Sequence, residues 1–571
     1  MASEAQEVLP EDTVLILGGG PVGMMSATVL AFYGVKSVVL ERNLTTTNVD
    51  KYREMISARN DGTMPLEPWQ RISQEIFEAW LKELAEGHPL IDIRFGWKLE
   101  SILETDLGVE AVVTDLNNSK TVKFKSRYAV GCDGASSRVR RSLNIPLEGG
   151  PVPGFVLLVH FKSNDLARIH KQGRFWHLFM VRDGVMGGAA ISQDEKDTFT
   201  THLFLPMDTD ESKISTEEAV YKVFGGMYEP FEVKIDKVLV RSTYRPSIAV
   251  AHEYSSPNGW IYLAGDSAHQ NIPTGGYGMN MGLGDAYDIG WKLAAVIQGW
   301  AGKGMLQSYG PERRPVALIN VERSSVHLAV HSAVPKILGE HAHELDANST
   351  KGRQLRTAIH EHYQANDGEN TDLGIEMGYR YNSNIIVPEK NEVEPKWTAH
   401  DYYPTTWPGI RPPHIFLKNG SALFDHFGKY FNLVHFIDPK KEGNHAEFFD
   451  EAATALEIPL KVLGLQDEDH ARSLWERDMV LIRPDGHVSW RGNSVDYRST
   501  AYYVLEVAAG LRISTNGALD GQIAVSGPPP NETKGTHGYY SNNDPTDFTS
   551  TEGLTSQGSE SKLEKMGHFQ E

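Results

Sequence analysis

The sequence predicts an α/β protein with more than one domain, on the basis of three observations. Residues 13–40 alternate strand, helix and strand around a cluster of glycines. Residues 155–245 contain successive β segments with little helical periodicity, which indicates an antiparallel sheet. Residues 408–525 alternate strands and helices again. The length of 571 residues agrees with several domains, because one domain usually takes about 100–200 residues.

The composition is that of a globular protein, with 40% hydrophobic and 23% charged residues. The formal net charge of −20 argues against a general nucleic-acid-binding protein, which normally shows a basic face. Cys132 is the only cysteine, which excludes an intramolecular disulfide framework and suits a reducing compartment. The apolar run from Val14 is interrupted by glycines and is too short to span a bilayer. We therefore expect a cytoplasmic protein that binds no nucleic acid and has no membrane span.

The first strand-helix-strand unit carries a dinucleotide-binding signature of the Rossmann type. The glycines at its G-x-G-x-x-G positions are Gly18, Gly20 and Gly23. They provide the tight turn, the close approach of backbone to a pyrophosphate, and the packing of helix on strand. The second strand, Lys36–Leu40, ends at Glu41 and Arg42. A carboxylate at this position can bind ribose hydroxyls, which favours FAD or NAD over NADP at this site.

The next segments lead to an acidic motif. Leu66–Leu84 is predicted to form a helix that carries Arg71 and Gln74, and by pattern alone its polar side is a solvated face. Trp97–Phe124 is predicted to be a three-stranded antiparallel meander. The strand after it breaks at the sequence GCDG, where Asp133 stands between a strand end and a helix start. The β segments of residues 155–245 then predict a sheet inserted into the nucleotide-binding domain, as a wall of a substrate pocket.

A stretch of similar design follows the predicted sheet. Ile261–Ala264 is an apolar strand that breaks at Gly265 and Asp266, and Pro273–Gly278 is a loop rich in proline and glycine before a helix. The free N–H groups of a helix start attract negative charge, and Asp266 can accept a ligand hydroxyl. The combination indicates a site for a phosphorylated or electron-rich ligand. An ordinary strand-to-helix turn explains the same pattern, and this stretch alone does not decide between the two.

The rest of the chain supplies helices and a second α/β unit. Gln307–Gln364 is predicted to be mainly helical, and its paired histidines are two residues apart, so they point in different directions and form no metal site. Residues 430–511 follow the strand and helix order of a thioredoxin-like domain. Without a C-x-x-C motif this unit cannot exchange dithiols, so we expect it to serve packing or dimerisation. Residues 526–571 are nearly free of aliphatic residues and are expected to be disordered.

Three motifs together resemble the FAD fingerprints of the group A flavoprotein monooxygenases, of the phenol hydroxylase and polyketide hydroxylase type. They are GGGPVG at 18–23, GCDG at 131–134 and AGDSAHQNIPTGGYGMN at 264–280, in the order of that family. The thioredoxin-like unit is typical of the phenol hydroxylase branch. The resemblance covers residues 10 to about 525, and its specificity lies in the combination of motifs.

The resemblance implies FAD as the cofactor. Glu41 and Arg42 would contact its adenosine part, Arg71 and Gln74 the middle of the cofactor, and Asp266 the ribityl chain. The other contacts expected from the three fingerprints are Gly18, Gly20, Gly23, Asp133, Gly265, Pro273, Gly276, Gly278, Met279 and Asn280. The implied domains are a FAD-binding domain at 10–154 and 246–390 (the second part including the helical region), a β-rich substrate domain at 155–245, a thioredoxin-like domain at 400–525 and a tail at 526–571.

The chain departs from the family pattern between Glu41 and Gln74, where it is several dozen residues shorter. A helix after the second strand, and strands beyond it that frame the flavin and substrate, are expected to be missing. Two explanations stay open: a divergent short form of the family, or a mis-spliced or truncated gene product. In the second case the shortened 43–60 segment would weaken FAD binding or turnover.

The resemblance also implies a mechanism. NADPH, or NADH, would reduce the flavin and leave, O2 would form a flavin hydroperoxide, and a phenolic substrate would attack its distal oxygen. Arg245 and Tyr244 are the candidate catalytic residues, because an arginine lowers the pKa of a nearby phenol and a tyrosine can relay a proton. A surface ion pair for Arg245 and simple packing for Tyr244 explain the same residues equally well.

Three other functions stay open at this point. The flavin could support Baeyer–Villiger oxidation or epoxidation, or the protein could be a FAD-dependent dehydrogenase or oxidase that inserts no oxygen. A non-enzymatic alternative is a FAD-binding or interaction protein left inactive by the shortened segment. The expected partners are an aromatic substrate and O2, and the family suggests a homodimer.

Overall fold

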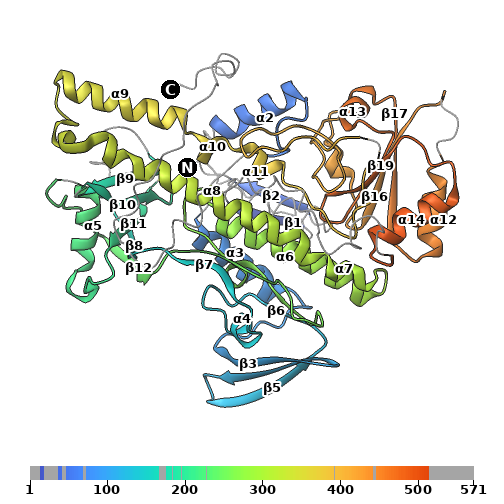
Figure 1. Cartoon of the computed structure of the whole chain (residues 1–571), viewed down its shortest axis with the longest axis horizontal. Coiled ribbons are helices and arrows are strands. Elements are labelled where there is room, and N and C mark those ends of the chain that lie inside the picture. Colours follow the sequence, from blue (N-terminus) through green and yellow to red (C-terminus); the bar gives the residue numbers. More distant parts are fainter. Residues whose placement is uncertain are drawn as a thin grey trace, which may run out of the picture. The chain divides into compact units, whose positions relative to one another are not determined.

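The computed structural model describes residues 13–17, 36–40, 47–68, 73–165, 175–182, 184–194, 196–226, 228–390, 392–440 and 445–512 (Figure 1). Predictions that concern residues outside these ranges are those for Gly18, Gly20, Gly23, Glu41, Arg42, Arg71, the helix between the first two strands and the tail at 526–571.

The first two strands confirm the beginning of the nucleotide-binding unit. β1 (Thr13–Leu17) and β2 (Lys36–Leu40) pair in parallel, with Thr13 opposite Lys36. Parallel pairing of consecutive strands requires a crossover between them, as expected for a strand-helix-strand unit.

The segment after β2 corrects one expectation. A helix, α2 (Thr47–Arg59), occupies the stretch where we expected the family's helix to be missing. Ile56 is buried, and the side chain of Asn60 exchanges two hydrogen bonds with the backbone of Phe416, at 2.9 and 2.7 Å. These contacts to a distant segment stabilise a helix whose own sequence has few apolar residues at helical spacing, which is why the pattern did not predict it.

The following helix begins later than predicted. α3 spans Gln74–Gly87, whereas the sequence indicated Leu66–Leu84. Pro68 disfavours helical conformation in the residue before it, and the carbonyl of Ser73 accepts the first hydrogen bonds of the helix, from the N–H groups of Ile76 and Phe77. The first helical turn therefore forms after this proline.

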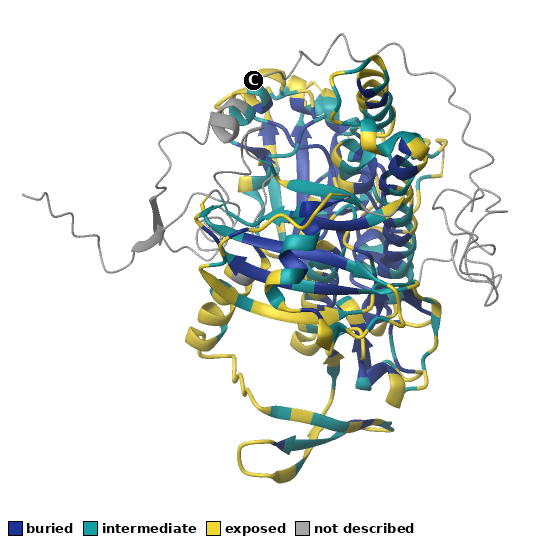
Figure 2. Ribbon diagram, turned by 90° about the vertical axis from the view of Figure 1, so that its left-hand side faces the viewer, coloured by how far each residue is buried: buried dark blue, intermediate teal, exposed yellow. Residues whose placement is uncertain are grey.

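The predicted meander is present. β3 (Trp97–Thr105), β4 (Gly108–Asp115) and β5 (Lys120–Ser126) pair antiparallel, and Ser119 takes the left-handed conformation in the second turn. The meander lies at the bottom of Figures 1 and 2, where Figure 2 shows much of it exposed. The short elements that connect it to the rest of the nucleotide-binding region are β6 (Ala129–Gly131), α4 (Arg138–Ser142), β7 (Leu147–Pro151), β13 (Ser247–Ala251), β14 (Ile261–Leu263) and β15 (His269–Gln270).

The antiparallel sheet predicted for residues 155–245 is confirmed. Its strand order is β12-β8-β11-β10-β9, and α5 (Thr216–Gly225) packs on one face. Strand alternation directs Leu157, Val159 and Phe161 toward α5, so their neighbours in sequence lie on the opposite face. The strands are β8 (Phe155–Lys162), β9 (His177–Arg182), β10 (Val185–Ser192), β11 (Thr198–Leu205) and β12 (Lys237–Tyr244).

Two long helices connect the regions, as expected from the periodicity. α6 (Tyr277–Gln298) follows the glycine-rich loop, and α8 (Tyr309–Leu338) contacts α6, β9 and β10. The shorter helices around them are α7 (Lys303–Gln307), α9 (Thr350–Ala365), α10 (Gly368–Thr371) and α11 (Leu373–Met377). No helix in the described part of the chain is both long enough and apolar enough to cross a bilayer.

The C-terminal unit has the predicted element order. Its sheet order is β17-β16-β18-β19, with β16 and β17 parallel and the other pairs antiparallel. Trp300 and Met305 share a hydrophobic cluster with Phe431, Phe449 and Leu505, so the helical region and this unit have a common core. The elements are β16 (Phe431–Ile437), α12 (Glu447–Ala455), β17 (Leu460–Gln466), α13 (Asp469–Trp475), β18 (Met479–Ile482), β19 (Val488–Gly492) and α14 (Arg498–Ala508).

Candidate functional site

Two acidic motifs come together at one sheet edge. β6 and β14 run parallel, so Asp133 and Asp266, which follow them, leave the pair at the same end. The motifs are also tied to each other, because the Ser267 hydroxyl donates to the carbonyl of Gly131 at 2.6 Å and Arg140 Nη1 donates to the carbonyl of Ser267 at 2.9 Å. Ligands of open α/β sheets bind at this kind of edge.

The two acids differ in availability. The Asp133 carboxylate accepts hydrogen bonds from Ser137 Oγ (2.5 Å) and from the backbone N–H groups of Arg138 (2.6 Å) and Val139 (3.0 Å), so it caps the start of α4. A contact from Asp133 to a cofactor stays a prediction. Asp266 is exposed and has no hydrogen-bond partner among the described residues, so its carboxylate is free to bind a hydroxyl.

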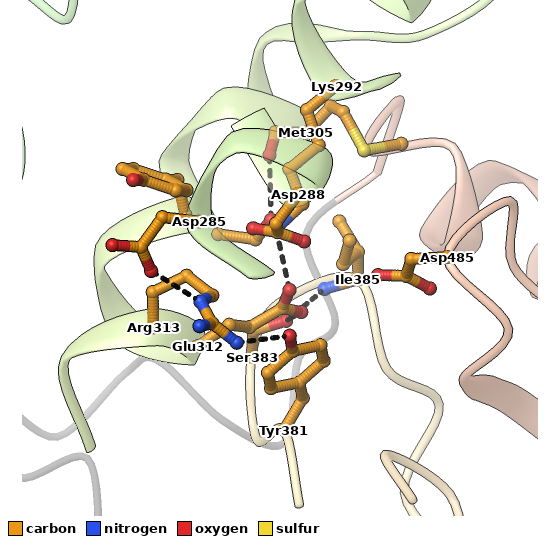
Figure 3. Close-up of polar contacts among 12 residues, drawn as sticks. Asp285, Asp288, Lys292, Met305, Glu312, Arg313, Tyr381, Ser383, Ile385 and Asp485 are labelled. Carbon is orange, nitrogen blue, oxygen red and sulfur yellow. Dashed lines mark hydrogen bonds and ion pairs between the residues drawn. The ribbon is translucent and has the colours of Figure 1, made fainter. Parts of the chain in front are cut away.

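A buried carboxylate holds the bend that carries Asp266. Asp285 on α6 accepts the N–H of Gly265 at 2.9 Å and contacts His269 Nε2 at 2.8 Å. Its second oxygen accepts the N–H of Arg313 Nε at 2.7 Å (Figure 3). Burial alone would raise the pKa of Asp285, but His269 and Arg313 outweigh it and hold this pKa low. Gly265 has a positive φ of 62°, which its lack of a side chain permits.

The glycine-rich loop before α6 is anchored by a distant acid. Glu369 on α10 accepts the N–H of Gly275 at 2.8 Å through one oxygen and contacts His331 Nε2 at 2.6 Å through the other. Burial opposes ionisation, but His331 and the Gly275 N–H outweigh it and lower the pKa of Glu369 to about 2. Glu369 and His331 could not be predicted from the sequence, because no local pattern marks a residue that acts 94 positions away from its partner.

The loop fits a flat electron-rich ligand such as the ring system of FAD. A Cβ atom built on Gly276 or Gly278 would meet no atom within 4 Å, so the backbone here borders open space. Gly276 is the N-cap residue directly before α6, no side chain caps this helix start, and Asn280 Nδ2 donates to the carbonyl of Gly276 at 2.9 Å. The uncapped N–H groups can therefore face a ligand. Met279 is half-buried in the first turn of α6, and Pro273 is exposed at the start of the loop.

The predicted flavin-contacting glutamine is engaged within its own helix. Gln74 is exposed and its amide donates to Glu78 at 2.5 Å. Contact between Gln74 and a cofactor stays a prediction.

The two candidate catalytic residues differ in burial and in their contacts. Tyr244 ends β12 half-buried, on the sheet face opposite α5, and burial raises its pKa to about 12. Arg245 is exposed and its Nε donates to the carbonyl of Val152 at 3.5 Å. Within the described residues no carboxylate lies within ion-pair distance of Arg245, whereas Arg241 pairs with Glu211 at 3.1 Å. The surface ion pair that the sequence left open for Arg245 is therefore formed by Arg241 on β12 instead.

Two family models match the chain. A FAD binding domain model matches residues 11–64 and 49–324, and an aromatic-ring hydroxylase C-terminal model matches residues 405–509. Among known proteins, the chain is 46% identical over 571 residues to FAD-dependent monooxygenase apdD of Emericella nidulans, covering 88% of this chain and 91% of that one. It is 44% identical over 486 residues to FAD-dependent monooxygenase opdD of Penicillium oxalicum, covering 84% and 92%.

Solved structures give the same result. The flavin-dependent monooxygenase PieE, solved in complex with FAD and substrate, matches with a TM-score of 0.67 and 26% identity, covering 88% of this chain and 99% of that chain. The fold and the glycine loop thus define an α/β flavoprotein. The chain belongs to the FAD-dependent monooxygenases that combine a FAD-binding domain with an aromatic-ring hydroxylase C-terminal domain. This confirms the family expected from the three motifs.

Proposed function

We propose that this enzyme uses NADPH, or NADH, and O2 to hydroxylate a phenolic or aromatic polyketide-like small molecule. The observation that supports this most is a side-chain link between the glycine loop and the inserted sheet. Glu369 holds both Gly275 and His331, and the His331 ring stacks on Phe179 of β9 with ring centroids 3.9 Å apart. A flavin on the loop and an aromatic ring on the sheet would therefore be neighbours.

FAD would be held by the motifs at 18–23, 131–134 and 264–280, with Asp266 at the ribityl chain and the backbone from Gly276 to Asn280 at the ring system. When bound, FAD takes reducing equivalents from NAD(P)H and activates O2. The open space beside Gly276 and Gly278 and the uncapped start of α6 support this placement.

The chain's own side chains would orient the substrate and exclude water. Arg245 would stabilise the ionised form of the substrate hydroxyl and so lower its pKa. The Tyr244 hydroxyl would hold or pass on the proton. The walls of the sheet would keep water from the reacting atoms, since water diverts activated oxygen from the substrate.

The visible absorption spectrum of the purified protein tests the proposal, measured before and after NADPH is added with a panel of phenols. A flavin spectrum that bleaches with NADPH, faster with one phenol present, together with a product carrying one atom of 18O from labelled O2, is the expected result. Peroxide as the sole oxygen product would instead identify an oxidase. Insertion beside a ketone or across an alkene would identify a Baeyer–Villiger or epoxidising enzyme.

The proposal has further parts that rest on the sequence. We place the enzyme in the cytoplasm on its single cysteine and propose a homodimer from the family. The domain boundaries given above, and a weakened affinity for FAD caused by a shortened 43–60 region, belong to the same proposal. Protein that takes up no FAD would make the family relationship one of ancestry without activity.

A further inference from the structure

One histidine on the inserted sheet stands out because neither of its ring nitrogens has a hydrogen-bond partner among the described residues. The antiparallel register places five residues in a row across the face opposite α5: Ser242, Leu158, His202, Ala189 and Phe179. His202 lies in the middle of this row, on β11, and only 9% of it is exposed. It contacts the ring of Tyr244 edge-on, with centroids 6.1 Å apart.

The row leads to the glycine loop. Phe179 at its end stacks on His331, and through Glu369 this histidine is linked to Gly275. Neighbouring strands are about 4.8 Å apart, so His202, two strands from Phe179, lies about 10 Å from it along the sheet. A bicyclic or larger aromatic molecule on this face can therefore reach from His202 to the loop.

The polar atoms of His202 and Tyr244 have no hydrogen-bond partner among the described residues but remain in contact with solvent. Neither the ring nitrogens of His202 nor the hydroxyl of Tyr244 has a hydrogen-bond partner within the described part of the chain. Both groups also keep contact with solvent, since neither belongs to the buried atoms without a partner. His160 on the same face differs, because its Nδ1 contacts Thr200 Oγ1 at 2.8 Å. Polar groups left open in a nearly buried site are those that a ligand must satisfy.

The two groups of the pair carry no charge of their own. Burial and the neighbouring His177 lower the pKa of His202 to about 4, and burial raises the pKa of Tyr244 to about 12, so both are uncharged at neutral pH. Lys162, a cation of the same face, is paired with Asp197 at 2.8 Å. A carboxylate placed beside His202 would therefore lose its hydration without gaining a counter-charge from these residues.

We propose that His202 and Tyr244 are the specificity-determining pair of the substrate site and hydrogen-bond a hydroxyl or carbonyl oxygen of an oxygenated aromatic molecule that has no carboxylate beside them. This inference rests on the proposed function for the site and adds the substrate class. His202 acts in recognition, and the reacting carbon is near the loop at the other end of the row.

Binding of two probes to the FAD-loaded enzyme tests the pair without turnover. The probes are 1,8-dihydroxyanthraquinone, which is neutral, and anthraquinone-2-carboxylate, and the dissociation constants are measured from the change in flavin absorption. Wild type is expected to bind the neutral probe at least tenfold more tightly. His202→Phe and Tyr244→Phe should each weaken that binding about tenfold, because each removes one hydrogen bond. His202→Gln, which keeps a donor and an acceptor, should retain most of it.

Ser242→Ala is the matched control, since Ser242 lies in the same row at the exposed edge strand and should leave both constants unchanged. Unchanged binding in Tyr244→Phe and His202→Phe overturns the pair, and so does a wild type that prefers the carboxylate or binds neither probe. If His202→Phe fails to fold, two results still test the pair: binding of the neutral probe should be mostly retained in His202→Gln and weakened in Tyr244→Phe.

Different experimental results would show that the proposed pair is wrong and that the proposed function is wrong. If NADPH is consumed and a phenol is hydroxylated equally by wild type and His202→Phe, with equal KM, the pair is wrong and the function stands. If the neutral probe binds and the variants weaken it, but no phenol yields an oxygenated product, the pair stands and hydroxylation is wrong.

Discussion

Glu312 on α8 and Arg483, directly after β18, form a buried two-point ion pair. Arg483 Nη1 donates to Oε1 at 2.7 Å and Nη2 to Oε2 at 2.8 Å, and both side chains are fully shielded from solvent. Lys292 of α6 donates to the same carboxylate at 2.6 Å (Figure 3). The helix that starts at the glycine loop is thereby fixed to α8 and to the C-terminal unit.

Two more acids share this site. Asp288, Glu312 and Asp485 bring carboxylate oxygens within 4.8 Å of one another, and Lys292 and Arg483 balance much of their charge. Burial raises the pKa of Asp288 above that of an ordinary aspartate. Burial acts in the same direction on Glu312, but Arg483 and Lys292 outweigh it and keep its pKa low.

Replacing Arg483 by methionine should lower the free energy of unfolding by about 3–5 kcal/mol, because the variant leaves buried carboxylates without a counter-charge. Denaturant unfolding of the FAD-free protein measures this. Arg498→Met is the matched control, since Arg498 pairs with Glu451 at 2.5 Å on the surface, where solvent screens the pair, and should change stability little. Equal effects of the two substitutions would contradict a special role for the buried pair.

Replacing Asp288 by asparagine should change how stability depends on pH. The folded protein keeps the Asp288 proton up to a pKa of about 7, whereas the unfolded chain releases it above about 4. Unfolding is therefore increasingly favoured as pH rises from about 4 to about 7, and Asp288→Asn removes this loss. The melting temperature of the variant relative to wild type should rise across that window and level off above it. A difference that is constant from pH 4 to pH 8 would contradict the assignment.

Removing the carboxylate of Glu369 should weaken FAD binding, because the loop that would hold the ring system loses the acceptor for the Gly275 N–H. We expect Glu369→Ala to raise the FAD dissociation constant about ten- to hundredfold, the usual effect of losing a hydrogen bond to a charged group. Flavin fluorescence titration of the apoprotein measures it. Glu369→Gln, which keeps an acceptor, should lose less, and Glu361→Gln on the exposed side of α9 should lose nothing.

Arg245→Ala should impair hydroxylation more than FAD binding. An arginine near a phenol lowers its pKa by about 1–3 units, so its loss should reduce the ionised fraction at neutral pH, and with it kcat/KM, at least tenfold. The readouts are product formed per NADPH consumed and the FAD dissociation constant of the same protein. Equal turnover in variant and wild type would remove Arg245 from the mechanism.

Local pattern predicted most of the elements. The successive β segments of residues 155–245, with little helical periodicity, predicted the five strands of the inserted sheet, and the strand and helix order of the C-terminal unit was also confirmed. The errors lie where distant contacts or a proline set the boundary. α2 depends on Asn60 bonding to Phe416, and α3 begins only after Pro68.

The candidate site also has parts that the local sequence predicted and parts that it did not. Sequence indicated the edge with Gly265 and Asp266 and the loop at Pro273–Gly278, because a strand end, a glycine turn and a helix start are local demands of the backbone. No local pattern indicated Glu369, which binds the Gly275 N–H. The sequence paired Tyr244 with Arg245, its neighbour along the chain, whereas in the structure Tyr244 contacts the ring of His202.

By itself, the sequence determined the family, the cofactor class and the order of strands and helices, because motif spacing and periodicity are properties of short segments. Only the tertiary structure decided which side chains meet. Glu369 reaches Gly275 across 94 positions and Arg483 reaches Glu312 across 171. Such pairs depend on how sheets and helices pack, and packing brings together residues whose distance along the chain carries no signal.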